Sequence, residues 1–326
     1  MGYRVIQWAT GTIGRRALTV SLEHPDLEVV GVRVYDPAKV GEDIGTLAGL
    51  EPVGVAASDD VDALVAMDAD CVLHMPSRCD VDELCRLLAS GKNVVSTCSE
   101  FVQPRYGLAD DVLAQLEAAC EAGGTSLFAT GSSPGFISDV LPMALLFVQR
   151  SLRTLVIEEF ADLSQRPSPK LLFEVMGMGR RPGAVDERRA AHLGASFGPS
   201  LQALAARVGL PTDRVDAQAE VAVATKPITI AAGDTVRISF RATWYCTDVL
   251  EPAWPLGATG WRVTVDGDAP FTVELPFPIT TEQLAAVTPG YTAHPAVNAV
   301  AAVCEARPGV LTTADLPVIV PRLLSL

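Results

Sequence analysis

A turn near the start of the chain carries the first residue pattern that could bind a ligand. It reads Ala9-Thr10-Gly11-Thr12-Ile13-Gly14, with a short apolar strand before it and a helix after it. A helix that begins there directs unpaired backbone N–H groups and the positive end of its dipole at an anion, which suits a pyrophosphate. Gly11 lets phosphates approach the backbone, and Gly14 lets the helix pack closely on the strand. We predict nucleotide contacts from residues 9–13, although Ala9 replaces the first glycine of G-x-G-x-x-G and ordinary turns share the rest of the pattern.

Charged residues stand about 20 residues beyond the turn, at the end of the next expected strand, where a dinucleotide fold reads the ribose. Asp36 could accept a hydrogen bond from a 2′-hydroxyl, which indicates NAD. Arg33 or Lys39 could pair with a 2′-phosphate, which indicates NADP, and Tyr35 in the same cluster is predicted to contact the cofactor. A plain Asp-Pro turn with solvated charges would contain the same residues, so the sequence leaves NAD and NADP open.

Glu100 is the residue that we select as a general acid or base. It comes just after the strand expected over residues 93–97, and ligands of an open α/β sheet bind at the carboxyl ends of its strands. The adjacent Phe101 and Val102 are expected to shield the carboxylate, so that it can exchange protons near neutral pH. A helix-capping or surface glutamate is the alternative interpretation.

Three further residues at strand ends are expected to lie near the cofactor. His74 ends the third expected strand, Pro76 follows it, and Cys98 follows the fourth strand. A Cys98 thiolate that attacks an aldehyde is a second chemical possibility, and it needs an imidazole partner such as His74 or His294. A small strand-end residue and a core histidine are the plainer interpretations of the same positions.

The segment 130–136 is expected to form a hinge and to face the same cleft. Phe136 would then be a wall of the substrate pocket, or else a core aromatic residue. Phe160 and Met176 would make the pocket apolar and suited to a small aliphatic substrate, whereas the arginine pair at 180–181 would bind a carboxylate if it faced inward.

Two kinds of hydrophobic periodicity divide the chain. Up to residue 149, short β-branched runs alternate with helical spacing, which predicts a parallel sheet with crossover helices. Its strands are expected at residues 4–9, 27–35, 70–74, 93–97 and 126–129. Later strands at 152–162, 219–230, 235–245, 261–265 and 271–275, with a helix at 200–208, predict a mixed or antiparallel sheet. The expected fold class is α/β, with a Rossmann-type domain over residues 1–149 and 293–326 and an α+β substrate-binding and dimerisation domain over residues 150–292.

The composition limits the possible partners. The 326 residues carry a net charge of −14, which repels nucleic acids, and no apolar run approaches the ~20 residues of a membrane span. The seven cysteines are scattered, and we expect reduced core thiols. The four histidines show no metal-ligand spacing, so no metal is expected. We expect a cytoplasmic protein, because the first residues lack the pattern of a signal peptide.

Taken together, these motifs resemble those of the native amine dehydrogenase and 2,4-diaminopentanoate dehydrogenase group, whose N-terminal domain is similar to that of dihydrodipicolinate reductase. The resemblance rests on residues 7–14, 35–41, 96–100, 131–136 with Asp139, 173–180, 292–298, 308–309 and 315–317. The histidine-pair and lysine motif of dihydrodipicolinate reductase is absent, which disfavours its substrate. The resemblance implies that the glutamate after the family's fifth strand carries over to Glu100, that Phe136 takes the aromatic position of the pocket, and that the protein is a homodimer. His294 is also predicted to line the pocket.

The resulting hypothesis is an NAD(P)-dependent enzyme that interconverts a primary amine with a small ketone or aldehyde and ammonia, with Glu100 as acid and base. A carbonyl or semialdehyde reductase that does not use ammonia is one alternative. A nucleotide-binding sensor without catalytic activity is another.

Overall fold

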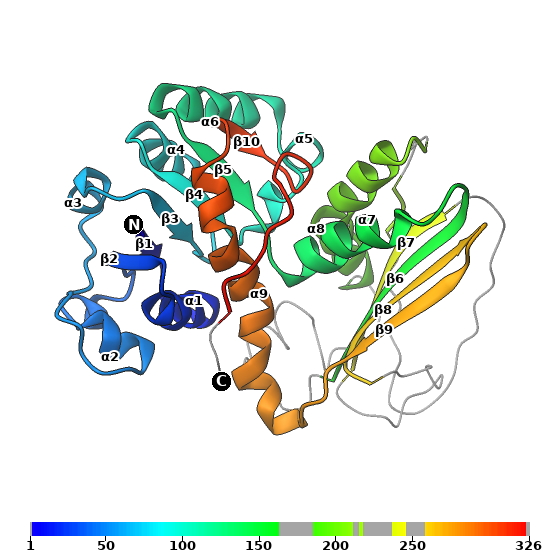
Figure 1. Ribbon diagram of the computed structural model, residues 1–326, viewed down its shortest axis with the longest axis horizontal. Helices are drawn as coiled ribbons and strands as arrows, with labels where there is room; N and C mark the ends of the chain where they lie inside the picture. Colours follow the sequence, from blue (N-terminus) through cyan, green and yellow to red (C-terminus); the bar gives the residue numbers. More distant parts are fainter. Residues whose placement is uncertain (1, 163–184, 211–214, 218–236, 246–257, 324–326) are drawn as a thin grey trace. The chain divides into compact units, whose positions relative to one another are not determined.

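The computed structural model describes residues 2–162, 185–210, 215–217, 237–245 and 258–323 (Figure 1). The chain divides into two compact units, the first formed by Met1–Phe136 with Pro289–Leu326 and the second by Ile137–Thr288. The predicted boundaries, at residues 149 and 292, lie later in the chain than the observed ones, which follow Phe136 and Thr288. The first difference arises because α7 (Leu141–Leu146) contacts strand β8 (Gly260–Gly267) within the second unit.

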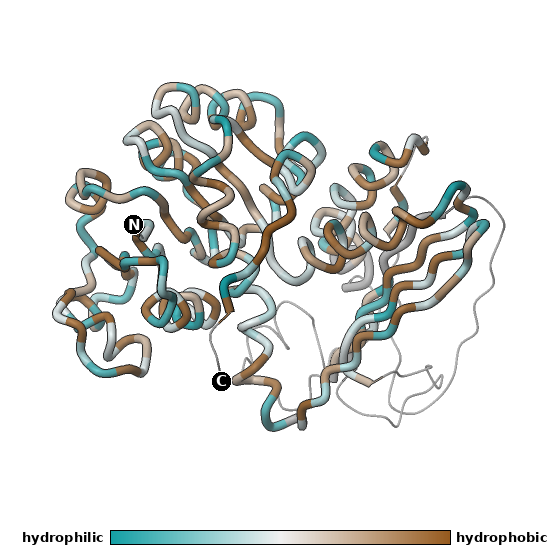
Figure 2. The backbone as a smooth tube through the Cα atoms, in the orientation of Figure 1, coloured by the Kyte–Doolittle hydropathy of each residue, from teal (hydrophilic) through white to brown (hydrophobic). Residues whose placement is uncertain are grey.

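The first unit is built on a six-stranded sheet in the order β10-β5-β4-β3-β1-β2, and every neighbouring pair is parallel. The strands are β1 (Tyr3–Trp8), β2 (Leu27–Arg33), β3 (Cys71–His74), β4 (Asn93–Ser96), β5 (Ser126–Ala129) and β10 (Gly309–Leu311). The five predicted strands are confirmed to within two residues at each end. The short β10 was not predicted, because three residues carry no periodicity. β3, β4 and β5 are hydrophobic in their middle, where the tube is brown in Figure 2.

Helices cover both faces of this sheet, as the crossover pattern predicts. One core contains buried side chains of α1 (Thr12–Glu23) and α9 (Thr281–Cys304), and the other contains side chains of α4 (Val81–Ala89) and α6 (Asp110–Gly123). Each fully buried leucine or isoleucine in these cores contributes roughly 1.5–3 kcal/mol relative to exposure. The shorter elements are α2 (Ile44–Ala48), α3 (Val61–Ala66), α5 (Pro104–Gly107), η1 (Pro37–Lys39) and η2 (Ser99–Phe101). The C-terminal segment Pro289–Leu326 belongs to the first unit.

The second unit contains a four-stranded mixed sheet in the order β7-β6-β8-β9. Its other strands are β6 (Leu152–Asp162), β7 (Arg237–Tyr245) and β9 (Phe271–Pro276); β6 pairs parallel with β7 and antiparallel with β8. Its described helices are α7, α8 (Val185–Arg207) and the start of α9. The segment η3 (Ser132–Val140), which is non-helical at Ser133, Pro134 and Gly135, spans the unit boundary. The helix predicted from residue 200 was placed too late, because Pro199 lies inside α8 and resembles a helix start. The strand predicted at 219–230 lies outside the described residues.

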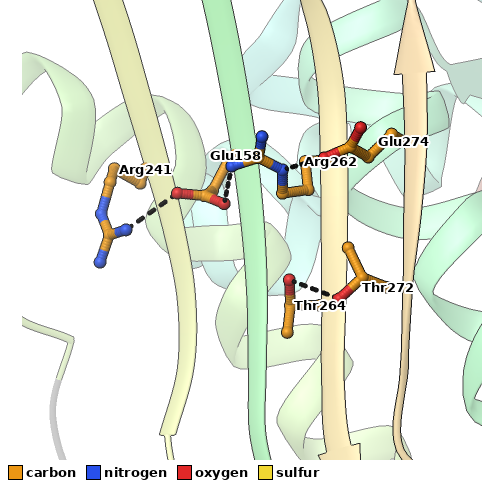
Figure 3. A network of polar contacts seen from close by, with 6 residues as sticks. All are labelled: Glu158, Arg241, Arg262, Thr264, Thr272 and Glu274. Atoms are coloured by element: carbon orange, nitrogen blue, oxygen red, sulfur yellow. Dashed lines mark hydrogen bonds and ion pairs between the residues drawn. The ribbon is translucent and has the colours of Figure 1, made fainter. Parts of the chain in front are cut away.

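One face of this sheet carries a row of charged side chains that crosses all four strands (Figure 3). Glu158 on β6 accepts hydrogen bonds from Arg241 on β7 at 2.9 Å and from Arg262 on β8 at 3.5 Å. Arg262 also donates to Glu274 on β9 at 2.8 Å. The signs alternate along the row. Together, the two units confirm the predicted α/β class with a Rossmann-type parallel sheet and a second, mixed sheet.

Candidate functional site

The glycine turn between β1 and α1 has the geometry of an anion site. Ala9 adopts a φ of 79°, and among the described residues other than glycine it is alone in having a positive φ. A Cβ placed on Gly14 would lie 2.1 Å from the Ala9 carbonyl oxygen, so the close packing predicted for Gly14 is observed. A Cβ placed on Gly11 would meet nothing within 4 Å, and no side chain caps α1 at Gly11. The first N–H groups of α1 therefore have room for a ligand above them and find no acceptor in the described part of the chain.

Lys39 adds positive charge directly beside this turn. Its Nζ donates to the Thr10 carbonyl oxygen at 3.2 Å and to the Thr10 Oγ1 at 3.3 Å. Asp36 is exposed, and its Oδ1 accepts the backbone N–H of Ala38 at 3.0 Å, so one carboxylate oxygen is used to cap η1. These contacts fit a pyrophosphate and an adjoining ribose phosphate, because the Lys39 ammonium and the unpaired N–H groups of α1 lie around the space above Gly11.

Arg33 and Tyr35 form a flat surface at the end of β2. The Arg33 guanidinium carbon lies 4.5 Å from the centre of the Tyr35 ring, and Tyr35 remains 53% exposed. Glu83 on α4 holds this surface, because its Oε1 accepts the Trp8 indole N–H at 2.8 Å and the Tyr35 hydroxyl at 3.3 Å. A planar group such as a nucleobase can stack on a surface of this kind. Arg33 and Tyr35 were predicted from the sequence, whereas Glu83 and Trp8 were not.

The ends of β3 and β4 enclose a buried polar cluster. The His74 Nδ1 lies 3.0 Å from the Ser96 Oγ, which also accepts the Cys98 N–H at 3.1 Å. Burial lowers the pKa of His74 to about 4, so this imidazole is neutral at physiological pH. The Cys98 Sγ lies 3.7 Å from the Pro76 carbonyl oxygen, and burial raises the pKa of the Cys98 thiol to about 11. The thiolate form of Cys98 is therefore scarce near neutral pH.

Glu100 lies in η2, immediately beyond the carboxyl end of β4, and it is exposed. The resemblance implied a glutamate after a fifth strand, and in this chain the residue follows the fourth. Phe101 and Val102, which were expected to shield the carboxylate, are 1% and 3% exposed and pack into the core. This expectation was wrong, because the short helical turn directs neighbouring side chains to different sides. β1 and β4 run parallel in one sheet, so Glu100 and the glycine turn lie at the same edge.

The residues assigned to a substrate pocket fall in different places. Phe136 is half-buried at the end of the first unit, and Phe160 lies in the second unit, where the Arg262 guanidinium is 5.1 Å from its ring. His294 belongs to the part of α9 in the first unit, and its Nε2 accepts a hydrogen bond from the Arg16 Nε at 3.3 Å. Burial and the Arg16 charge lower the pKa of His294. Met176 lies outside the described residues, as do the arginines at 180–181.

Three comparisons relate this arrangement to known proteins. Residues 5–121 match the family of the dihydrodipicolinate reductase N-terminus. An amine dehydrogenase from Streptomyces virginiae is 33% identical over 181 residues, which are 54% of this chain and 50% of that protein. The chain resembles amine dehydrogenases.

Solved structures show the same fold over nearly the whole chain. An amine dehydrogenase from Mycobacterium smegmatis matches with a TM-score of 0.70 at 20% identity, covering 99% of this chain and 98% of its own. A DAP dehydrogenase from C. glutamicum matches with a TM-score of 0.51 at 16% identity, covering 97% and 94% of the two chains. The sequence match to the Streptomyces amine dehydrogenase spans only half of that relative's length.

Two residues near the turn were not singled out from the sequence. Gln7 on β1 is fully buried, and its Nε2 donates to the Ala9 carbonyl oxygen at 3.0 Å. A polar residue between Ile6 and Trp8 in an otherwise apolar strand was the available signal. Arg16 carried no such signal, because its partner His294 is distant in sequence.

The described residues contain no group of three or more His, Cys, Asp or Glu side chains that could hold a metal ion. None of the helices described is both long enough and apolar enough to cross a membrane.

Proposed function

We propose that the protein is an NAD(P)-dependent amine dehydrogenase that interconverts a primary amine with a small ketone or aldehyde and ammonia. The observation that carries the proposal is the exposed carboxylate of Glu100 at the same edge of the parallel sheet as the glycine turn. The sequence of this chain also resembles that of an amine dehydrogenase. This reaction needs a dinucleotide and one group that exchanges protons, and both have candidate residues at that edge.

The first turn of α1 is proposed to hold the pyrophosphate, with Arg33 and Tyr35 against the adenosine half. When bound, the nicotinamide ring supplies a hydride donor or acceptor. Lys39 and Arg33 place two cations around the turn, and one oxygen of Asp36 already caps η1. We therefore expect both coenzymes to bind and the 2′-phosphate of NADP to be preferred. Pro76 and the backbone at Cys98 stay proposed contacts, whereas the enclosed His74 side chain supports the strand ends.

Glu100 is proposed to move the protons of the reaction. In the aminating direction its carboxylate takes a proton from ammonium, so that neutral ammonia can add to the carbonyl carbon. After the addition, a proton passes from the new ammonium nitrogen to the alkoxide oxygen, which gives the carbinolamine. The carboxylic acid then returns its proton to the hydroxyl of the carbinolamine, which leaves as water and gives an iminium. In the reverse direction the carboxylate takes a proton from the water that attacks the iminium. Phe136, Phe160, Met176 and His294 are the proposed pocket residues, and the aromatic ones favour a small aliphatic substrate.

The buried pair His74 and Cys98 disfavours an aldehyde dehydrogenase that uses a thiolate. Such an enzyme needs a thiol with a lowered pKa, and burial raises the pKa of Cys98 instead. The His74 Nδ1 lies 4.0 Å from the Cys98 Sγ, and burial keeps its imidazole neutral. An imidazolium that could stabilise the thiolate is therefore not available at this site near neutral pH.

The test is a spectrophotometric assay with NADPH or NADH, high ammonium concentration and a panel of small ketones and aldehydes. Glu100→Gln is expected to lower the ammonia-dependent rate at least about 100-fold, the usual contribution of a general acid or base. Glu121→Gln, an exposed carboxylate on α6, is the matched control. A rate that does not depend on ammonia would favour a carbonyl reductase. Tight binding of NADPH without turnover on the whole panel would favour a sensor.

A homodimer formed through the sheet of the second unit is also proposed. The row Arg241, Glu158, Arg262 and Glu274 alternates in sign, so a second copy related by a two-fold axis perpendicular to the row would bring each arginine opposite a glutamate. Light scattering coupled to gel filtration should give twice the chain mass of 34.4 kDa. Arg262→Glu should shift the protein to the monomer mass; a monomeric native protein would contradict the proposal.

A further inference from the structure

Gln7 is a neutral amide in the middle of a core strand, which is an unfavourable place for it. Its side chain is fully buried, and its Oε1 finds no donor among the described residues. A buried amide with an unmet acceptor destabilises the fold compared with an apolar side chain of the same length. The side chain therefore makes a poor contribution to folding, and its contacts point to another role.

The amide donates to a single well-placed acceptor. Its Nε2 lies 3.0 Å from the Ala9 carbonyl oxygen, and the Trp8 carbonyl oxygen is farther away at 3.5 Å. The same Ala9 oxygen faces Gly14, where a Cβ would come within 2.1 Å of it. The Ala9 carbonyl is thus held between Gln7 and the backbone of α1, pointing into the protein.

The direction of this carbonyl fixes the direction of the next N–H. The peptide between Ala9 and Thr10 is planar and trans, so its N–H points opposite to its C=O. With the carbonyl turned toward Gln7, the Thr10 N–H points away from Gln7 and finds no acceptor in the described part of the chain. In this orientation of the Ala9–Thr10 peptide, Ala9 has a φ of 79°, a conformation that residues with a Cβ rarely adopt.

We infer that Gln7 is a positioning residue for the dinucleotide: its amide holds the Ala9–Thr10 peptide so that the Thr10 N–H faces the phosphates. This inference rests on the proposed NAD(P) binding and assigns a role to a residue that does not itself reach the ligand. A glycine at position 9 would adopt the positive φ without strain. The hydrogen bond from Gln7 is therefore needed to hold this peptide only because residue 9 carries a Cβ.

A double-mutant cycle tests this coupling, with nucleotide affinity as the readout. Gln7→Met removes the amide at almost constant length, and the Kd for NADPH is measured by the quenching of tryptophan fluorescence and by calorimetry. Gln7→Met is expected to weaken NADPH binding about tenfold, the effect of one hydrogen bond. In the Ala9→Gly background, the same change is expected to weaken binding less than about threefold relative to Ala9→Gly alone.

Two further variants separate this role from a general loss of structure. Gln7→Glu keeps the length but opposes the Ala9 carbonyl with an oxygen, so it should weaken binding at least as much as Gln7→Met. Ser21→Ala removes a buried hydroxyl from α1, distant in sequence from the turn, and should leave the Kd unchanged. Gln7→Met should not lower the melting temperature, because it removes the unpaired Gln7 Oε1 together with the hydrogen bond to Ala9.

The outcomes distinguish this inference from the proposed function. An equal loss of affinity in the unmodified and the Ala9→Gly backgrounds, or no loss in either, overturns the role of Gln7 while leaving NAD(P) binding intact. Failure of the unmodified protein to bind either NADPH or NADH overturns both.

Discussion

Protonation of His74 should destabilise the protein in mild acid, by an amount that follows from its burial. The imidazole is fully buried, and burial lowers its pKa from 6.5 to about 4. In the unfolded chain the pKa returns to about 6.5, so below that pH the unfolded state takes up a proton that the folded state does not. The stability associated with neutral His74 is therefore fully present above pH 6.5 and is lost as the pH falls toward 4.

The size of the effect can be worked out from these two values. Each unit of pKa difference corresponds to 1.36 kcal/mol, so the whole shift is worth about 3 kcal/mol and about 2 kcal/mol is lost by pH 5. Urea unfolding followed by tryptophan fluorescence at pH 7.5, 6.5, 5.5 and 5.0 measures this loss. His74→Leu lacks the titrating group, so its free energy of unfolding should fall about 2 kcal/mol less over the same range. His192→Gln, at an exposed position on α8, is the matched control and should follow the unmodified protein. Parallel pH profiles for His74→Leu and the unmodified protein would refute the reasoning.

Three other perturbations have expected outcomes. Arg33→Ala should raise the Kd for NADPH at least about fivefold more than the Kd for NADH, because one charged hydrogen bond is lost only with the 2′-phosphate; equal changes in titrations of both would contradict this. Gly14→Ala should lower the free energy of urea unfolding by about 2–3 kcal/mol, since the new Cβ would lie 2.1 Å from the Ala9 carbonyl oxygen; an unchanged value would show that the turn can move. Glu158→Gln should cost about 1–2 kcal/mol in the same assay, whereas Arg241→Gln should cost less than about 1 kcal/mol, because Glu158 is 12% exposed and Arg241 is 65% exposed; the reverse order would contradict this.

The parallel sheet was predictable because its strands are buried on both faces. Such strands appear as short β-branched runs, and the stretches around Val94 and Leu127 show this directly. Elements without that signal were missed or misplaced. β10 has only three residues, and its place beside β5 depends on backbone hydrogen bonds rather than on side-chain type. The start of α8 was placed near Pro199, since a proline at a helix start and one within a long helix have the same local sequence.

Contacts within the candidate site could be predicted where the residues are close in sequence. Thr10 and Lys39 are 29 positions apart, and the Lys39 Nζ lies 3.2 Å from the Thr10 carbonyl oxygen. Contacts between distant residues gave no such signal. Arg16 and His294 are separated by 278 positions, and Glu83 and Tyr35 by 48 positions. Spacing along the chain contains no information on such pairs.

The substitution of alanine for the first glycine of the turn can be understood from opposing energies of similar size. The positive φ of Ala9 costs roughly 1–2 kcal/mol in a residue with a Cβ. Its methyl group is buried, which contributes about 0.8 kcal/mol, and glycine would lose a further ~0.5–1 kcal/mol of backbone entropy on folding. Since these terms nearly cancel, alanine and glycine are about equally acceptable here. The hydrogen bond from Gln7 to the Ala9 carbonyl, worth about 1 kcal/mol, offsets much of the cost of the positive φ. The residue two positions before the turn therefore carries information on nucleotide binding that the glycine pattern alone leaves out.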